Sequence, residues 1–291
     1  MKIDFVSIII VHYQVEKVLF SCLKTIYSQQ VKSKFEVIVV DNGSHAGFEK
    51  RLSDQYSQTK YFKAPKNLGY GAGNNFGATQ AEGDILFFLN PDTELLPGCV
   101  DVLVNFLHTQ TNAGIVAPTL LHTNLQLFAQ QGSLTLTPLR AIAAHSIVHR
   151  LWPNNPISNA FWLSTVSQKN NRKVEVVPGT AVMISRQNFV AVGGFDESFF
   201  LYFEEYDMCR RMLALGKEIW MLGNAQIIHV WEGTSKGMNT NEIYRQSLRK
   251  YLVKYYGSII GQLTFNVTQL SKNQLLLILI FALSVFLALL Y

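Results

Sequence analysis

The stretch GDILFFLNPDTEL, residues 83–95, decides the fold that we expect. Its segment Asp84–Leu89 is apolar after the first residue, too short for an average helix and typical of a strand buried on both faces. The turn sequence Asn90-Pro91-Asp92 follows at once. Ligands of α/β sheets bind beyond the carboxyl ends of the strands, so this stretch predicts a central strand with a polar site at its end.

The residues before this stretch repeat the pattern of a short apolar run followed by a helical one. Further strands are predicted at Val6–His12, Phe35–Val40 and Tyr61–Ala64. Helices are predicted at Val15–Gln29 and Asn74–Ala81. Strands that alternate with helices predict βαβ units, and therefore a Rossmann-like α/β fold with a mostly parallel sheet flanked by helices.

The residues after this stretch continue the pattern with one interruption. The predicted strands are Gly114–Pro118, Ala181–Ser185, Glu218–Leu222 and Ala225–His229, and the predicted helices are Pro97–Thr109 and Glu204–Leu215. Between residues 131 and 173 the periodicity weakens, which indicates a variable insertion. This insertion either faces a membrane or packs on the domain as a loop.

The C-terminal end differs in composition from the rest of the chain. Hydrophobic residues make up 48% of the sequence and charged residues 15%, and the apolar excess is concentrated at this end. Residues 241–273 are predicted to form a basic amphipathic helix and a linker. Residues 274–291 contain no charge and follow Lys272, so we expect a transmembrane tail anchor that leaves the main domain on the cytoplasmic side. The alternative, a buried core helix, is disfavoured because nothing follows it to cover it.

Charge and cysteine content exclude several classes of protein. The formal net charge is only +5, without the basic stripe and interleaved aromatics of a nucleic-acid-binding protein. The three cysteines form no CxxC pair, which excludes a cysteine zinc site and a disulfide framework and favours a reducing cytosol. No GxSxG, P-loop or HExxH motif occurs.

Two segments are candidates for nucleotide binding. Asp41 ends a predicted strand, where its carboxylate either accepts a hydrogen bond from the ring N–H of a uracil or thymine base or caps the turn that follows. The Gly-rich stretch Asn67–Asn75 lacks the third glycine of a dinucleotide fingerprint, because Phe76 stands there. Its backbone N–H groups either face a diphosphate or serve close packing.

Three further positions are candidates for metal binding and acid–base chemistry. Asp92 at a strand end suits a divalent metal that bridges two phosphates, although Asn-Pro-Asp is also an ordinary turn. Glu204, Glu205 and Asp207 stand at a helix start, where an acid acts either as a general base or as a partner of the helix dipole. His229 ends a strand and is either a metal ligand or a structural residue.

Taken together, seven segments resemble glycosyltransferase family 2 and its rhamnosyltransferase-like branch. They are VSIIIVHYQ, EVIVVDNGS, NLGYGAGNNFGA, GDILFFLNPDTEL, PGTAVMISR, GGFDESFFLYFEEYDMCRR and IIHVWEGTS, in the family's order over about residues 5–235. The resemblance implies a GT-A fold over residues 1–240 and inverting transfer of a sugar from a nucleotide-diphosphate donor with a divalent metal, Mn²⁺ or Mg²⁺.

The resemblance also implies roles for individual residues. The nucleotide sugar is expected at His12, Tyr13, Asp41, Asn67 and Asn90, the metal at Asp92 and His229, and the catalytic base at Glu205 or Glu204. This sequence departs from the family's usual pattern at two positions. Asn90 replaces an acid of the metal motif, and Glu205 stands where the base is usually Asp, so Glu204 is the alternative base.

The expected activity follows from the branch that the sequence resembles. dTDP-rhamnose is the first expected donor and a UDP-hexose the second. The expected acceptor is a hydroxyl of a lipid-linked glycan, used in cell-surface polysaccharide synthesis at the cytoplasmic face of a bacterial inner membrane. The first alternative is a catalytically inactive nucleotide-sugar-binding or scaffold protein of a glycan-assembly complex. A dinucleotide oxidoreductase is the second alternative. It is disfavoured because the Gly-rich stretch lacks the third glycine of a dinucleotide-binding motif.

Overall fold

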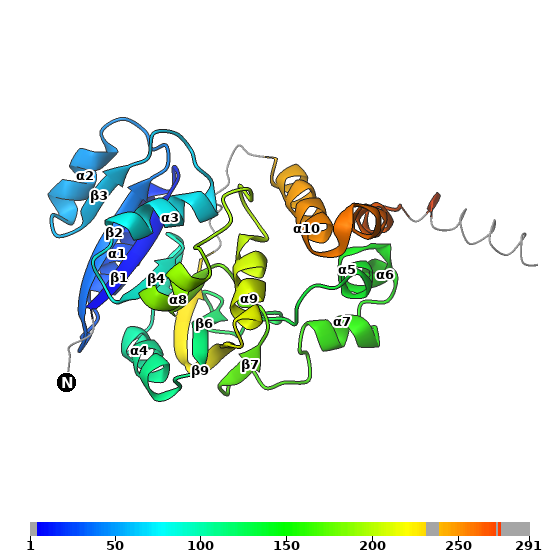
Figure 1. The fold of residues 1–291 in the computed structure, drawn as a ribbon. Coiled ribbons are helices and arrows are strands. Elements are labelled where there is room, and N and C mark those ends of the chain that lie inside the picture. The colour runs from blue at the N-terminus through cyan, green and yellow to red at the C-terminus, as the bar shows by residue number, and fades with distance from the viewer. Residues whose placement is uncertain (1–4, 231–238, 272, 275–291) are drawn as a thin grey trace, which may run out of the picture. The chain divides into compact units, whose positions relative to one another are not determined.

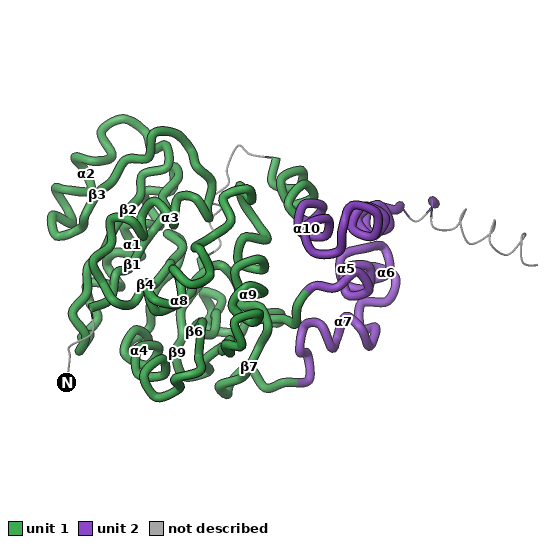
Figure 2. The backbone as a smooth tube through the Cα atoms, viewed as in Figure 1, with its two compact units in different colours: residues 1–135, 166–247 green, residues 136–165, 248–291 purple. Residues whose placement is uncertain are grey.

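The computed structural model describes residues 5–230, 239–271, 273 and 274 of the chain (Figure 1). These residues form two compact units, coloured separately in Figure 2. Unit 1 comprises residues 1–135 and 166–247, and unit 2 comprises residues 136–165 and 248–291.

Unit 1 is built on one sheet, whose nine described strands follow the order β3-β2-β1-β4-β8-β6-β9-β5, with β7 paired to β9. The strands are β1 (Phe5–His12), β2 (Lys34–Asp41), β3 (Lys60–Lys63), β4 (Ile85–Leu89), β5 (Thr93–Leu95), β6 (Ala113–Leu121), β7 (Arg172–Val174), β8 (Ala181–Ser185) and β9 (Glu218–His229). The run that opens residues 83–95 is therefore a central, fully buried strand, as predicted.

Strand direction divides the sheet into two parts. β1 pairs in parallel with β2 and β4, and β2 with β3, as predicted for βαβ units. β8 is antiparallel to both of its neighbours, β4 and β6, and β5 and β7 are antiparallel to β9, so the sheet is mixed. The other six described strands share one direction, which agrees with the expectation of a mostly parallel sheet. The direction of β8 has a topological cause: the chain leaves β6 at the edge where β4 ends and re-enters through β8 at the same edge.

Helices cover both faces of the sheet in unit 1. They are α1 (Glu16–Tyr27), α2 (Phe48–Gln55), α3 (Tyr70–Gln80), α4 (Cys99–Thr109), α8 (Arg186–Ala191) and α9 (Glu204–Ala214). Side chains alternate along β1: Ile8 and Ile10 join the core cluster that contains residues of α1 and α4, whereas Ile9 points toward α3. Both faces of β1 are therefore buried, which explains why most of its residues are apolar.

Two boundaries differ from those that the sequence predicts. Glu218–Leu222 and Ala225–His229 form a single strand, β9, with an irregularity in its register opposite Pro118 and Thr119 of β6. Helix α3 begins at Tyr70 rather than Asn74, because glycines that favour a loop locally are packed against the sheet.

The central part of the insertion predicted at residues 131–173 belongs to unit 2 and forms short helices rather than a loop. These are α5 (Pro138–His145), α6 (Ile147–Leu151) and α7 (Pro156–Phe161), each begun by a side chain that caps the helix. The last described helix, α10 (Thr240–Thr268), is broken at Gly257 (φ 78°), and its part from Leu248 onward belongs to unit 2. The Tyr256 hydroxyl donates to the Leu136 carbonyl at 2.9 Å and links the two segments of the unit.

The predicted tail anchor at residues 274–291 lies, except for Gln274, outside the described residues. Among the helices that are described, none combines the length and the apolar character needed to cross a membrane.

Candidate active site

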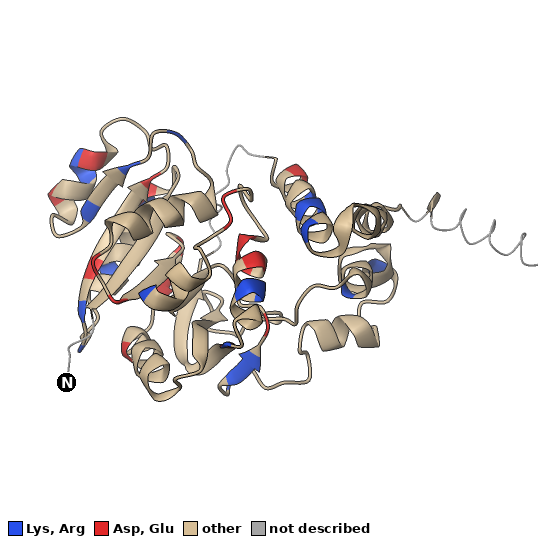
Figure 3. Cartoon of the chain, in the orientation of Figure 1, with Lys and Arg blue, Asp and Glu red and all other residues tan. Residues whose placement is uncertain are grey.

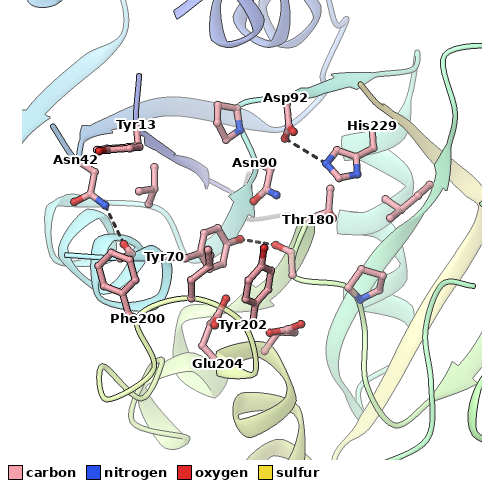
Figure 4. A pocket seen from close by; sticks show the side chains of 18 of the residues that line it. Tyr13, Asn42, Tyr70, Asn90, Asp92, Thr180, Phe200, Tyr202, Glu204 and His229 are labelled. Atoms are coloured by element: carbon pink, nitrogen blue, oxygen red, sulfur yellow. Dashed lines mark hydrogen bonds and ion pairs between the residues drawn. The ribbon is translucent and has the colours of Figure 1, made fainter. Parts of the chain in front are cut away.

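Unit 1 contains a cavity of about 420 Å³ at the carboxyl ends of β1 and β4 and at the start of α9 (Figure 4). Seven of the nine site residues predicted from the sequence line it: Tyr13, Asn67, Asn90, Asp92, Glu204, Glu205 and His229. The position agrees with the general preference of α/β folds for ligand sites at strand ends.

Asp92 and His229 meet at one side of this cavity. Asp92 precedes β5, whose antiparallel pairing with β9 sets Thr93 opposite His229. The N–H of Val230 donates to the Asp92 carbonyl at 2.9 Å and extends this pairing. The side chains come together as a result, with Asp92 Oδ1 3.3 Å from His229 Nε2.

This pair is the candidate metal centre. In the described part of the chain no group of three His, Cys, Asp or Glu side chains is placed to hold a metal ion. Asn90 adds a buried Oδ1 for which the described residues provide no hydrogen-bond partner. Mg²⁺ and Mn²⁺ in phosphate sites commonly take one or two side chains and complete their shell with phosphate oxygens and water. The donor set therefore fits a divalent ion that is held together with a diphosphate.

Two adjacent carboxyl groups begin α9 on the same cavity. Glu204 is 3% exposed, whereas Glu205 is partly exposed. Burial raises the pKa of Glu205 to about 7. Burial, and then the charge of Glu205, raise the pKa of Glu204 well above its usual range. A carboxyl group with a pKa near 7 is suited to act as a general base at neutral pH.

The backbone that leads into α9 is strained. Tyr202 and Phe203 both adopt left-handed conformations, with φ of 68° and 69°. This conformation costs a non-glycine residue about 1–2 kcal/mol, and such strain is often found at functional sites. It turns the chain abruptly, so that the carboxyl groups of Glu204 and Glu205 start the helix at the cavity wall.

Asn42, the residue that follows β2, organises another wall of the cavity. Its side-chain amide donates to Asn67 Oδ1 at 2.9 Å and to the Gly69 carbonyl at 3.0 Å. Its Oδ1 accepts the N–H of Leu68 at 2.8 Å. One side chain therefore connects the end of β2 with the loop that begins α3.

His12 and Asp41, also predicted to bind the nucleotide, lie beside the cavity and not in its lining. Asp41 accepts hydrogen bonds from the N–H groups of Gly43 and Ser44 and, at 2.7 Å, from the Tyr61 hydroxyl. These bonds lower the pKa of Asp41 against the opposing effect of burial, and they are the contacts of a turn-capping carboxylate. Burial lowers the pKa of His12 to about 4. Base recognition by either residue stays a prediction.

The Gly-rich stretch serves close packing at several positions. A Cβ added to Gly77 would lie 2.5 Å from a methyl carbon of Ile9, and one added to Gly73 would lie 3.0 Å from Val11. Gly69 (φ 82°) allows the following N–H, that of Tyr70, to donate to the Phe200 carbonyl at 2.8 Å. The packing interpretation therefore explains these glycines, and contact of the loop with a diphosphate is untested.

Comparison with known proteins identifies the family. The sequence model described as "Glycosyl transferase family 2" matches residues 7–189, which is more than half of the chain. The chain belongs to this family. The matched segment contains both the Asn42–Asn67 contact and the Asn90–Asp92 turn, whereas the Glu204-Glu205 pair and His229 lie beyond it.

Two proteins whose names state an activity are similar to this chain over most of its length. One is an N-acetylglucosaminyl-diphospho-decaprenol L-rhamnosyltransferase of Mycobacterium tuberculosis, 26% identical over 66% of this chain and 66% of the relative. The other is the low-salt glycan biosynthesis hexosyltransferase Agl10 of Haloferax volcanii, 28% identical over 78% of this chain and 66% of the relative. The chain thus spans just under two thirds of the length of these relatives.

Solved structures of other glycosyltransferases share the fold of this family member. GalNAc-T7 with UDP, GalNAc and Mn²⁺ gives a TM-score of 0.62 at 13% identity, over 84% of this chain and 47% of that one. The mannosyltransferase PcManGT of Pyrobaculum calidifontis, with GDP-Man and Mn²⁺, gives 0.58 at 14% identity, over 92% and 69%. The fold is therefore that of the GT-A glycosyltransferases, as the sequence predicted.

Tyr70 is a partly exposed residue of the Gly-rich segment that lines the cavity, and its role was not predicted. Its hydroxyl donates to the Gly179 carbonyl, and its ring contacts Phe195 edge-on with centroids 6.1 Å apart. A Cβ on Gly179 would lie 3.6 Å from the Glu205 side chain. Tyr70 therefore fixes the loop that packs against Glu205. In the sequence, the only sign of this role was that Tyr70 stands inside the segment NLGYGAGNNFGA.

Proposed function

We propose that the chain catalyses inverting transfer of a sugar from a nucleotide-diphosphate donor to a hydroxyl group. The observation that carries this proposal is the shared cavity: Glu205, with a pKa of about 7, lines the same space as Asp92 and His229. A base and a diphosphate-binding group on one cavity are what a direct displacement at an anomeric carbon requires.

In this mechanism the Glu205 carboxylate takes the proton of the acceptor hydroxyl. The acceptor oxygen forms a bond to the anomeric carbon as the bond from that carbon to the phosphate oxygen breaks. The electron pair leaves with the nucleoside diphosphate, and the single displacement inverts the anomeric configuration. Asp92 and His229 would hold a divalent ion, whose positive charge stabilises the diphosphate leaving group. Tyr70 keeps the Gly179 loop in place beside the base.

dTDP-rhamnose is the donor that we propose first, and a UDP-hexose second. The rhamnosyltransferase and hexosyltransferase names of the two relatives support this order. The cavity walls formed by Tyr13 and Asn67 offer an aromatic ring and a side-chain amide for binding the donor.

The acceptor that we propose is a lipid-linked glycan at the cytoplasmic face of a bacterial inner membrane, in cell-surface polysaccharide synthesis. The diphospho-decaprenol in the name of the mycobacterial relative supports a lipid-linked acceptor. The uncharged residues 275–291 support a location at a membrane.

A donor screen tests the proposal directly. Thermal unfolding is measured with dTDP-, UDP- and GDP-sugars, each with and without Mn²⁺, and the true donor is expected to raise Tm most when Mn²⁺ is present. Release of the nucleoside diphosphate by the stabilising donor is then followed in the presence of candidate acceptors. Strong stabilisation without any release would support the non-catalytic alternative instead.

A further inference from the structure

Charge is unequally divided between the two units of the chain. All twenty acidic residues lie in the segments of unit 1, which also contain nineteen basic ones. The segments of unit 2 contain six basic residues and no acidic one: Arg140, Arg150, Arg249, Lys250, Lys254 and Lys272. In Figure 3 no acidic residue is marked on α5, α6 or α7. The formal net charge of +5 therefore comes from unit 2.

Unit 2 also presents most of the exposed large apolar side chains in the described part of the chain. Seven of the twelve belong to it, although it is the smaller unit: Leu139, Leu151, Trp152, Ile157, Ile259, Ile260 and Leu263. Single exposed apolar residues need no explanation, but a concentration of them on one unit indicates a surface that contacts something else.

The apolar residues of α10 share one face of the helical segment after Gly257. Ile259, Ile260 and Leu263 are spaced as neighbours on a helix surface and are 75%, 56% and 61% exposed. Gly261, on the other side, is buried, and a Cβ there would lie 2.6 Å from the Leu252 backbone. The segment thus packs through its small residue and leaves its aliphatic face exposed.

Basic residues accompany these apolar ones in both segments of unit 2. Arg249, Lys250 and Lys254 are exposed on α10 just before Gly257. In the other segment, exposed Arg150 directly precedes Leu151 and Trp152. Aliphatic and Trp side chains beside Lys and Arg, without acidic residues, are the composition of protein surfaces that lie in the interface of a bilayer.

We propose that unit 2 docks on the surface of an anionic lipid bilayer, with Ile259, Ile260 and Leu263 entering the headgroup region. The charge of the unit complements anionic headgroups, and each basic residue near such a surface strengthens binding. In the sequence, α10 is followed, after Lys272, by nineteen uncharged residues that include the most apolar segment of the chain. The docking proposal rests on the membrane location proposed above. It adds which surface of the protein binds the membrane and which lipid charge this surface selects.

A local fluorescence probe tests the docking surface in the full chain. Leu263→Cys is labelled with the environment-sensitive fluorophore NBD, and Leu215→Cys, 52% exposed in unit 1, is the matched control. Labelling is selective because Cys22, Cys99 and Cys209 are buried and burial raises the pKa of each thiol to about 12. With phosphatidylglycerol vesicles, emission from position 263 is expected to shift to the blue and intensify, and emission from position 215 to stay unchanged.

A set of charge variants completes the test. Arg249, Lys250 and Lys254 are changed to Gln together. The variant is expected to need an about hundredfold higher lipid concentration for the same fluorescence change at position 263. The same change at Lys17, Lys24 and Lys32, exposed in unit 1, is expected to have little effect, and circular dichroism checks that both variants fold.

Three results would overturn the proposal. The first is NBD emission typical of water at position 263 in protein that sediments with the vesicles. The second is an equal change of emission with phosphatidylcholine vesicles. The third is an unchanged lipid dependence in the variant with Gln at positions 249, 250 and 254. Donor-dependent release of nucleoside diphosphate is measured separately without vesicles. Failure of the proposed transferase activity and failure of the docking surface are therefore distinguishable.

Discussion

Asp92 Oδ1 lies 3.3 Å from His229 Nε2, although one residue comes from the first half of the chain and the other from the end of its last strand. Antiparallel pairing of β5 with β9 brings them together, with Thr93 opposite His229. A shift of this register by one residue would turn His229 to the other face of the sheet. The geometry of the candidate metal centre therefore depends on the pairing of a three-residue strand.

Replacing Asp92 by Asn is expected to remove most of the stabilisation that Mn²⁺ adds to a nucleoside diphosphate. The variant keeps the size of the side chain but loses the charged ligand, and the apparent Mn²⁺ affinity should fall by at least about 10–100-fold. Thermal unfolding with dTDP or UDP, with and without Mn²⁺, measures the effect. Asp54→Asn, an exposed acid that pairs with Lys50, is the control. An undiminished Mn²⁺ effect in the Asp92 variant would reject the proposed site.

Replacing Glu205 by Gln is expected to lower the rate of transfer by about 10²–10⁴-fold, because the amide cannot accept the acceptor's proton. Donor affinity should change little. Transfer rates and donor Kd are measured for this variant and for Glu204→Gln side by side. A larger loss of rate in the Glu204 variant would assign the base to Glu204.

The transfer rate is expected to rise with pH and to level off above about pH 7. The reason is the pKa of about 7 to which burial raises Glu205: the carboxylate that accepts the proton is the minor form below this pH and the major form above it. Single-turnover rates between pH 5.5 and 8.5 measure the profile. A flat profile over this range would contradict Glu205 as the base.

Protein stability is expected to respond to pH in the opposite direction. Both glutamates have a raised pKa in the folded protein compared with 4.5 as the ordinary value. From about pH 4.5 upward the unfolded chain loses protons that the folded chain retains, so stability falls as pH rises. Glu204→Gln, which cannot ionise, should therefore have a higher Tm than the parent protein at pH 8 and a similar one at pH 4.5. Equal pH dependence of Tm in both proteins would refute this.

Gly69→Ala is expected to destabilise the protein by more than about 2 kcal/mol. The added Cβ would meet the Phe200 carbonyl oxygen at 2.1 Å, in addition to the strain of φ 82°. Gly193→Ala is the matched control, because its φ of 76° is similar but no atom lies within 4 Å of the added Cβ. Urea unfolding should show a clearly larger loss for Gly69, and equal losses would mean that backbone strain alone accounts for the effect.

Much of the fold was predictable because its parallel part is encoded locally. β1, β2 and β4 are short β-branched or aromatic runs, and each is followed by polar residues that mark the strand end. The direction of β8 was not predictable, because it depends on where the chain returns after residues 122–180 rather than on any property of Ala181–Ser185. Local preferences likewise placed the start of α3 too late, since its glycines are stabilised by contacts with β1.

The polar residues of the candidate site that stand at strand ends were predictable from the sequence. The contacts that support these residues were less predictable. Asn90, Asp92 and His229 end or follow strands, which is a signal present in the sequence. The links made by Asn42 and Tyr70 join segments that are distant along the chain, so only the folded structure reveals them. Glu204 is more buried than Glu205, and this difference could not be predicted from helical spacing alone.

The position of β9 between β6 and β5 has a consequence for synthesis of the protein. β5 leaves the ribosome early, but the strand that joins it to the sheet is translated more than a hundred residues later. Until residues 218–229 emerge, Asp92 has neither its strand partner nor His229 beside it. A nascent chain can therefore pair strands β1 to β4 long before Asp92 and His229 come together at the cavity. A prematurely terminated product would contain the first part without the second.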